Sequence, residues 1–488
     1  MNVKLDERYD LYINGRWVPA SDGRVFTTTN PATGEKLAEC AEATKEDVDA
    51  AVQAAWAAFP AWRDLEPDKR ADILLKIADV IDENKELLAT IESMDNGKPI
   101  RETMTIDVPY SSDHFRYFAG AIRTEEGTAS VLKDHVGHFM NIILHEPIGV
   151  VGQIVPWNFP FLMAAWKLAP ALAAGDCIVF KPSSTTSLSV LTLVKLIGHL
   201  LPPGVLNVVT GGGGRAGQYM LDHPGFRKLA FTGSTEVGRR FLEYAARSNL
   251  KRIVLELGGK SPFVVLDDVA DYAAVAAQAA AAAFWNMGEN CTANSRIIVP
   301  RKRKDAFTEA LLAELENWRI GDPLDPENNL GSIVSEGQFR TIMGYIEKGK
   351  TEGGHILTGG APLAIGSGLF IPPTIFDGVT PDMTIVREEI FGPVTAILPA
   401  DSDEEAVGLA NATAYGLQAT LFTEDVTKAH KYARALKAGT VSVNCFSEGD
   451  NTTPFGGYKL SGFGGKDKGR ESHDQYTETK TIFLNLDR

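Results

Sequence analysis

The sequence predicts an α/β protein in which βαβ units build parallel sheets. Between residues 149 and 247, short runs rich in β-branched residues alternate with stretches whose apolar residues recur at helical spacing. A second alternating series runs from Ile253 to about Leu398. Strands and helices that alternate in this way are typical of parallel sheets covered by helices. No internal repeat and no long polar linker interrupts the chain, so we expect closely packed domains.

The first series predicts its elements in a regular order. Helices are expected over 46–58 and 69–91, where Gly97 and Pro99 follow as stop signals. Strands are expected over 149–155, 177–180, 205–209 and 228–231, with helices over 162–174, 187–201, 216–221 and 237–247. The second series predicts helices over 272–284 and 304–318 and strands over 296–299 and 394–397. Segments 124–146 and 479–486 fit neither series, and the strand-like tail needs a partner edge in this chain or another.

Composition narrows the function. The 488 residues suggest two or three domains, and 44% hydrophobic residues suffice for large cores. A net charge of −15 argues against binding to nucleic acid or to anionic membranes. Four cysteines in so long a chain form no disulfide framework, and no Cys/His cluster indicates a metal. With no signal peptide and no apolar stretch of spanning length, we expect a soluble, cytoplasmic protein.

Two glycine loops are candidate nucleotide sites. Gly212, Gly214 and Gly217 match GxGxxG after a predicted strand, but a run of four glycines matches many patterns, and a tight turn explains it equally well. The loop 231–238 is better placed, because it ends a strand and Gly233 allows close backbone approach. Ser234 can cap the next helix, which leaves backbone N–H groups to face an anion.

Four further residues carry reactive or polar groups at the ends of predicted elements. Cys291 lies in a polar turn between helix and strand, where it is either a reactive thiol or a small buried apolar residue. Glu256, in an apolar strand end, suits a general base or a buried salt bridge with Lys260. Asn158 lies between two prolines and suits an oxyanion donor or a turn cap. Lys181 ends a strand, where ligands bind in open α/β sheets, or is a solvated lysine.

Five motifs turn these separate candidates into one hypothesis. They are VPWNFP (155–160), AFTGSTEVG (230–238), LELGGKSP (255–262), GENC (288–291) and EEIFGP (388–393). In this order and spacing the chain resembles the NAD(P)-dependent aldehyde dehydrogenase superfamily from about Tyr12 to its end. The resemblance implies a Rossmann-like cofactor domain (1–123 and 147–257) and an α/β catalytic domain (258–464). A small bridging element (124–146 and 465–488) would join subunits into homodimers or homotetramers.

The resemblance also implies the chemistry. Cys291 would attack the aldehyde carbonyl, and the Asn158 side chain with the Cys291 backbone N–H would hold the resulting oxyanion. Hydride would pass to the nicotinamide, and Glu256 would activate water to hydrolyse the thioester. Lys167 is implied as a further catalytic residue. The relay glutamate seen after Phe463 in many members has no clear counterpart, and Asp467 is its substitute.

NAD or NADP is the implied cofactor. Lys181 would bind the adenosine ribose, Ser234 the pyrophosphate, and Glu389 with Phe391 the nicotinamide ribose, while Trp157 would line the cleft. The remaining implied cofactor residues are Ile154, Pro156, Ser184, Gly214, Phe231, Gly233 and Leu257. Many NAD-preferring members have a glutamate where this chain has Ser184. A serine can hydrogen-bond a 2′-phosphate that a carboxylate would repel, so we expect NADP to be accepted. Alternatively, Ser184 only caps the following helix.

Substrate choice is less determined. The N-terminal half resembles members that act on aliphatic aldehydes, and the stretch 444–450 resembles members that act on ω-amino and γ-glutamylamino aldehydes. Glu448 and Asp450 near the pocket mouth would attract a cationic tail, and Trp166, Trp285 and Phe446 would line the tunnel; each is equally explained as a solvated acid or a core aromatic. A thiol esterase or hydrolase and a CoA-acylating dehydrogenase are the alternatives. The nucleotide loops count against the first, and Glu256 counts against the second.

Overall fold

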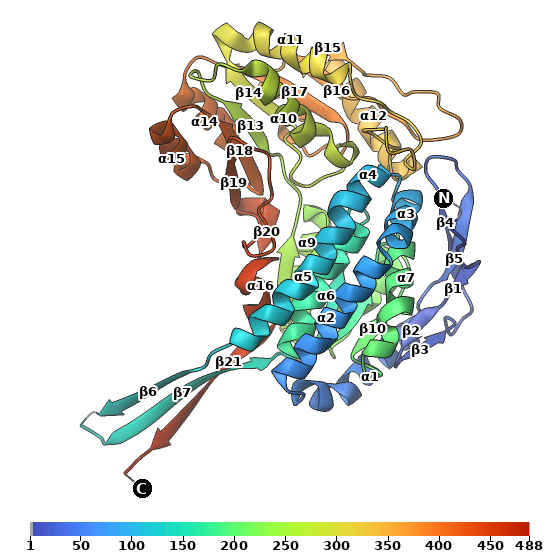
Figure 1. The fold of residues 1–488 in the computed structure, drawn as a ribbon, viewed down its shortest axis with the longest axis vertical. Helices are drawn as coiled ribbons and strands as arrows, with labels where there is room; N and C mark the ends of the chain where they lie inside the picture. The colour runs from blue at the N-terminus through green and yellow to red at the C-terminus, as the bar shows by residue number, and fades with distance from the viewer. Residues whose placement is uncertain (1–2, 134, 488) are drawn as a thin grey trace.

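The computed structural model describes residues 3–133 and 135–487. It contains two lobes, each built on a large sheet, and a three-stranded sheet that projects from the body with the C-terminus at its tip (Figure 1). Each lobe has its own buried apolar cluster. No helix of the described residues has both the length and the apolar character to cross a bilayer.

The first lobe is built on an eight-stranded sheet. In spatial order its strands are β20 (Gly462–Phe463), β12 (Arg252–Glu256), β11 (Lys228–Thr232), β8 (Val150–Ile154), β9 (Cys177–Lys181), β10 (Leu206–Val208), β2 (Leu11–Ile13) and β3 (Arg16–Val18). The five strands from β12 to β10 are parallel to their neighbours within that group, as the sequence predicts. Their carboxyl ends therefore meet at one edge.

Helices surround this sheet. They are α1 (Lys45–Arg63), α2 (Pro67–Glu83), α3 (Lys85–Asn96), α4 (Ile100–Glu102), α5 (Val108–Ala121), α6 (Pro160–Ala174), α7 (Leu188–Ile197), α8 (Gln218–Asp222) and α9 (Thr235–Arg247). Short turns of other helix types complete them: η1 (Thr103–Asp107), η2 (Ile122–Thr124), η3 (Gly198–Leu200) and η4 (Gly213–Gly217). A small sheet of β1 (Arg8–Tyr9), β5 (Lys36–Ala41) and β4 (Val25–Thr29) lies at the N-terminus.

The helix expected over 69–91 is two helices, α2 and α3. The break falls at Asn84, whose backbone N–H and side-chain amide both donate to the Val80 carbonyl, at 3.2 and 2.8 Å. An asparagine competes with the helix for backbone partners in this way. Because apolar spacing continues on both sides, the periodicity alone does not reveal the break.

The second lobe is built on a seven-stranded sheet. Its strands in order are β15 (His355–Thr358), β16 (Thr374–Asp377), β17 (Val394–Ala400), β14 (Arg296–Pro300), β13 (Pro262–Val265), β18 (Gln418–Phe422) and β19 (Thr440–Val443), and only β15 is antiparallel to its neighbour. The helices are α10 (Tyr272–Phe284), α11 (Lys304–Leu315), α12 (Glu336–Thr351), α13 (Thr384–Arg387), α14 (Asp403–Asn411) and α15 (Val426–Ala435), with the turns η5 (Trp285–Gly288), η6 (Arg301–Arg303) and η7 (Lys459–Ser461).

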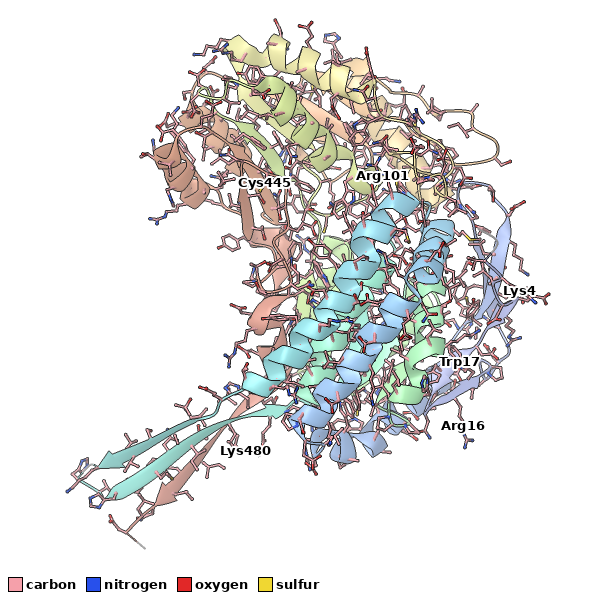
Figure 2. All side chains as sticks on the ribbon, in the orientation of Figure 1. Lys4, Arg16, Trp17, Arg101, Cys445 and Lys480 are labelled. Carbon is pink, nitrogen blue, oxygen red and sulfur yellow. The ribbon has the colours of Figure 1, made fainter. Side chains whose placement is uncertain are left out.

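The two segments that fit neither series pair with each other. β6 (Thr128–Lys133), β7 (His138–Pro147) and β21 (Thr477–Asn485) form the projecting sheet, in which β7 is central and antiparallel to both neighbours. A short helix, α16 (Gly469–Asp474), precedes β21. Figure 2 marks Lys480 on this sheet, near the end that joins the body. The tail thus finds its partner edge within the chain, while β6 and β21 keep one edge each without a neighbouring strand in the described residues.

Candidate active site

A cavity of about 260 Å³ is lined by residues of both lobes. The predicted nucleophile, base and oxyanion donor, Cys291, Glu256 and Asn158, all line it. Glu256 is the last residue of β12, and Asn158 lies between β8 and α6. The parallel strands of the first sheet therefore deliver two of the three groups to one edge.

The third group, Cys291, follows η5 in a tightly turned segment. Asn286, Met287 and Gly288 have φ values of 52°, 56° and 65°, so the chain passes through the left-handed region before it reaches the cysteine. Gly259 also allows two segments to approach closely here, because a Cβ at this position would lie 2.2 Å from the Cys291 carbonyl oxygen. The LGGK motif thus lets the nucleophile segment pack against the end of β12.

The thiol of Cys291 is half-buried and faces several acids. Burial raises its pKa well above the ordinary value, and the charges of Glu448, Glu389 and Glu256 raise it further, in that order. The Asn158 side chain is buried, and its Nδ2 donates to the Glu289 carbonyl oxygen at 3.0 Å. This bond reaches a carbonyl 131 positions away in the chain rather than a neighbouring turn.

Glu256 is buried, and burial is the main cause that raises the pKa of its carboxyl well above the usual range. The charge of Asp467 raises this pKa further, whereas Lys167 and Lys466 lower it. The alternative of a salt bridge with Lys260 does not hold: the Lys260 ammonium is buried without a hydrogen-bond partner in the described residues.

A buried ion pair lies near Glu256 and acts on the pKa of its carboxyl. The Lys167 Nζ donates to the Asp467 Oδ2 at 2.8 Å, and both side chains are almost fully excluded from solvent. Asp467 lines the cavity, but Lys167, on α6, does not. The two residues are 300 positions apart, and their pairing brings the segment after β20 onto α6.

Seven predicted cofactor residues line the same cavity: Pro156, Trp157, Gly233, Ser234, Leu257, Glu389 and Phe391. Ser234 caps α9 as expected, with its side chain accepting from the Val237 N–H. Glu389 Oε1 accepts from the Gly259 N–H at 2.7 Å, and a Cβ on Gly258 would lie 2.0 Å from Glu389 Oε2. Gly258 and Gly259 therefore also hold Glu389 in place on its side of the cavity.

Five predicted cofactor residues lie outside the central cavity. Ile154 ends β8, Phe231 stacks on Phe241 with ring centroids 4.4 Å apart, and Gly214 is exposed in η4. Lys181 Nζ donates to the carbonyl oxygens of Pro182 and Gly211 at 2.9 and 3.0 Å, and burial lowers its pKa to about 8.

Ser184, the fifth of these residues, lines a separate cavity of about 620 Å³ with Glu42 and Gly212. It does not cap α7, whose N-cap residue is Ser187. The alternative explanation of Ser184 as a helix cap therefore falls away.

An outer cavity of about 440 Å³ adjoins the central one, and Leu162, Trp166 and Glu448 line both. Trp285 and Phe446 line the outer cavity only. Asp450 lines neither: it is exposed, and its Oδ1 accepts from the Thr452 N–H at 2.8 Å. Glu448 lies deeper than a mouth position, because its carboxylate accepts from the hydroxyl of Thr292, the residue after Cys291.

Several lining residues escaped the sequence interpretation. Leu162 and Met163 lie on α6 one turn before Trp166 and Lys167, and both line the central cavity. The helical spacing of three to four residues back from Trp166 and Lys167 is therefore a sequence signal that predicts Leu162 and Met163 as lining residues. Gln338 on α12 donates to the Phe391 carbonyl at 2.7 Å, and no local pattern marks it. Arg101, marked in Figure 2, and Lys468 add cations to the outer cavity.

Comparison with known proteins identifies the family. A model described as the aldehyde dehydrogenase family matches residues 17–482. An aminoacetaldehyde dehydrogenase from Pseudomonas aeruginosa is 47% identical over 98% of this chain and 96% of its own. An acetaldehyde dehydrogenase from the same organism is 44% identical over 99% and 96%. The NAD+ complex of an aldehyde dehydrogenase from Bacillus cereus superposes with a TM-score of 0.96 at 41% identity over the full length of both chains.

An α/β fold of this topology, with a cysteine, a buried glutamate and an asparagine around one cavity, is that of a dehydrogenase of aldehydes. The chain belongs to the aldehyde dehydrogenase family. The predicted family, fold class and enzyme class are thereby confirmed.

Proposed function

We propose that this aldehyde dehydrogenase uses Cys291 as its nucleophile, Glu256 as its base and Asn158 as its oxyanion donor. The observation that carries the proposal is that these three side chains line one cavity together with Ser234, Glu389 and Phe391. The Cys291 thiolate attacks the aldehyde carbon, and the oxyanion of the thiohemiacetal accepts from Asn158 Nδ2 and the Cys291 N–H. Removal of one such donor typically costs about 3–4 kcal/mol of barrier.

The remaining steps use the same residues. Once the acyl thioester has formed, Glu256 accepts a proton from a water molecule, and the resulting hydroxide attacks the thioester carbonyl to release the acid. Burial favours this role, because a carboxyl with a raised pKa is a stronger base once it has lost its proton. The Lys167–Asp467 pair sets the local charge that Glu256 experiences. We assign Lys167 as a positioning residue, and Asp467 takes the place of the missing relay glutamate.

The residues present fit an NAD or NADP cofactor. The capped N-terminus of α9 leaves backbone N–H groups free for a pyrophosphate, and Glu389 is held by Gly259 in the orientation needed to accept from ribose hydroxyls. When bound, the oxidised nicotinamide supplies the acceptor for the hydride that leaves the thiohemiacetal carbon. The Ser184 hydroxyl lines the adjoining cavity and would donate to a 2′-phosphate, which supports acceptance of NADP, while Glu42 and Glu336 line the same cavity and oppose it.

We propose an amino aldehyde as the substrate class. The Glu448 carboxylate and the Trp166 ring line both cavities, and the Lys468 ammonium lies 5.0 Å from the centroid of that ring. A carboxylate beside aromatic rings suits an ammonium group. The name of one relative, an aminoacetaldehyde dehydrogenase, agrees with this class.

The test is a rate measurement with four combinations. Initial rates of reduced-cofactor formation are followed by absorbance with butanal or 4-aminobutanal, each with NAD and NADP. We expect activity with both cofactors, a higher specificity constant for 4-aminobutanal, and no activity in Cys291→Ala. Turnover that persists in Cys291→Ala would refute the assignment of the nucleophile. Equal specificity constants for the two aldehydes would refute the amino aldehyde class.

We further propose that the enzyme works in the cytoplasm as a homodimer or homotetramer that assembles through the bridging element, 124–146 and 465–488. Val131 and Phe483 on the projecting sheet are 65% and 57% exposed, and two strand edges lie without neighbours in the described residues. Exposed apolar side chains beside open edges favour pairing with a second copy. The same grouping of strands favours a cofactor domain at 1–123 with 147–257 and a catalytic domain at 258–464, except that β20, at 462–463, pairs with β12 in the first sheet.

A further inference from the structure

Three carboxylates act on the Cys291 thiol, and only two have a part in the mechanism above. Glu256 is the base, and Glu389 faces the cofactor side. The third, Glu448, comes from the loop after β19 and lines the central cavity with Cys291. Among the charges that disfavour the Cys291 thiolate, Glu448 acts most strongly. A free enzyme that places a carboxylate beside its nucleophile suppresses the reactive form.

The position of Glu448 is well defined. The Thr292 hydroxyl donates to its Oε1, and Thr292 follows Cys291 directly in the chain. The Lys468 Nζ donates to the backbone carbonyl oxygens of Glu448 and Gly449 at 2.7 and 3.3 Å, which holds the loop. Glu448 itself is half-buried and lines the outer cavity as well. Its carboxylate therefore faces the point where a substrate passes from one cavity to the other.

Charged groups of both signs surround Glu448. Burial is the main cause that raises the pKa of its carboxyl, the charge of Asp107 raises it too, and the charge of Lys468 lowers it. Arg101 also lines the outer cavity, and the Lys468 ammonium lies 5.0 Å from the centroid of the Trp166 ring. The Lys468 ammonium, however, is engaged with the backbone carbonyls, and no ion pair joins it to the Glu448 carboxylate among the described side chains. The indole N–H groups of Trp166 and Trp285, which line the outer cavity, have no hydrogen-bond partner there.

We propose that Glu448 binds the ammonium group of a short amino aldehyde, and that this cation offsets the charge of Glu448 on the Cys291 thiol. Because Thr292 directly follows Cys291 and donates to Glu448 Oε1, the carboxylate lines the central cavity close to the residue that follows the nucleophile in the chain, on the side where the ammonium of a short amino aldehyde would lie. The inference rests on the proposed function and names the substrate more closely. It also gives the substrate a part in activating the nucleophile: an empty site keeps the thiol protonated, and an ammonium in place promotes the thiolate.

The test measures the thiol itself, without turnover. Iodoacetamide alkylates the thiolate of Cys291, which displaces iodide, and mass spectrometry follows the peptide that carries Cys291. Cys445 is exposed but lies on a different tryptic peptide, and Cys40 and Cys177 are buried. Rates are recorded against pH with ethylammonium chloride, with ethanol, or with sodium chloride at equal concentration. The variants are Glu448→Gln, Glu448→Asp and the loop control Asp450→Asn.

The expected pattern follows from thiol chemistry. A tenfold gain in the thiolate fraction comes with a lower intrinsic reactivity of each thiolate, so it raises the net alkylation rate at pH 7 only about three- to fourfold. We expect that gain in Glu448→Gln without any ligand, and in the wild type with ethylammonium but not with ethanol or sodium chloride. Glu448→Asp retains the response to ethylammonium, and Asp450→Asn behaves as the wild type.

Two results would overturn the inference. One is an alkylation profile of Glu448→Gln that coincides with that of the wild type while its unfolding transition is also unchanged. The other is a wild-type response to ethylammonium no larger than the response to sodium chloride. Failure of the proposed function looks different, because then no aldehyde supports reduced-cofactor formation, whatever the alkylation rates are.

Discussion

The buried pair of Lys167 and Asp467 gives the sharpest prediction for stability. Asp467→Asn leaves the Lys167 ammonium in a site from which solvent is almost fully excluded, with its 2.8 Å partner replaced by a neutral amide. Removal of one partner of a buried pair typically costs about 3–5 kcal/mol, because the other charge stays buried without compensation. We expect a loss of about this size in the free energy of unfolding at pH 7, measured by urea denaturation.

Matched variants separate the pair from general effects. Asp401→Asn breaks the exposed pair of Arg301 and Asp401 and should leave the unfolding midpoint nearly unchanged. The double variant Lys167→Met/Asp467→Leu removes both charges at similar volume and should regain most of the loss. A loss below about 1 kcal/mol in Asp467→Asn would refute the reasoning, since Lys167 would then not need its partner.

The same pair predicts opposite shifts in the pH dependence of thioester hydrolysis. The charge of Asp467 raises the pKa of Glu256, and that of Lys167 lowers it. Asp467→Asn should therefore move the acidic limb of the hydrolysis rate to lower pH, and Lys167→Met should move it to higher pH. Single-turnover hydrolysis of the acyl-enzyme at several pH values measures the position of the acidic limb in each variant. Shifts in the same direction in the two variants would contradict the assigned charges.

Three further predictions concern other parts of the chain. Ser184→Glu should lower the ratio of the NADP to the NAD specificity constant by at least about tenfold, because a carboxylate repels the 2′-phosphate; an unchanged ratio from initial rates would contradict the place given to Ser184. Burial raises the pKa of Asp95 to about 8 from an ordinary value of 3.8, so its stabilising effect is complete below about pH 4 and is lost as pH rises to 8. Asp95→Asn should flatten the fall in unfolding free energy between pH 5 and 8, and an equally steep fall by urea titration would count against this. Phe483→Asp places a charge on the projecting sheet and should lower the molar mass from light scattering to that of a smaller assembly; an unchanged mass would exclude this face from the interface.

Local signals predicted the parts of the site that lie within a few residues of their cause. Ser234 follows a strand and precedes a helix, and it caps that helix. Glu256 ends an apolar strand and is buried there. Such positions follow from propensity and periodicity, which act over a single turn or strand. The parallel order of the strands follows from the alternation of strand and helix.

Contacts between distant segments lay beyond the sequence pattern. The ion pair of Lys167 with Asp467 depends on how the segment after β20 crosses α6, and nothing near either residue specifies that crossing. Gln338 reaches the Phe391 carbonyl from α12, again through packing of the second lobe. Asp450 and Glu448 look alike in sequence, yet one is exposed and the other lines both cavities. The path of the loop that carries both residues determines which of the two side chains faces the cavities.

The site combines two requirements that conflict at first sight. The proposed mechanism needs the Cys291 thiolate, but burial and three carboxylates raise the pKa of the thiol well above its ordinary value. On the proposals above, three partners would offset these charges: a cation at Glu448, ribose hydroxyls at Glu389 and a proton at Glu256. Because each acts on a different carboxylate, substrate and cofactor would each add to the fraction of Cys291 thiolate. A thiol governed in this way is protected from oxidants in the free enzyme, since oxidation also proceeds through the thiolate.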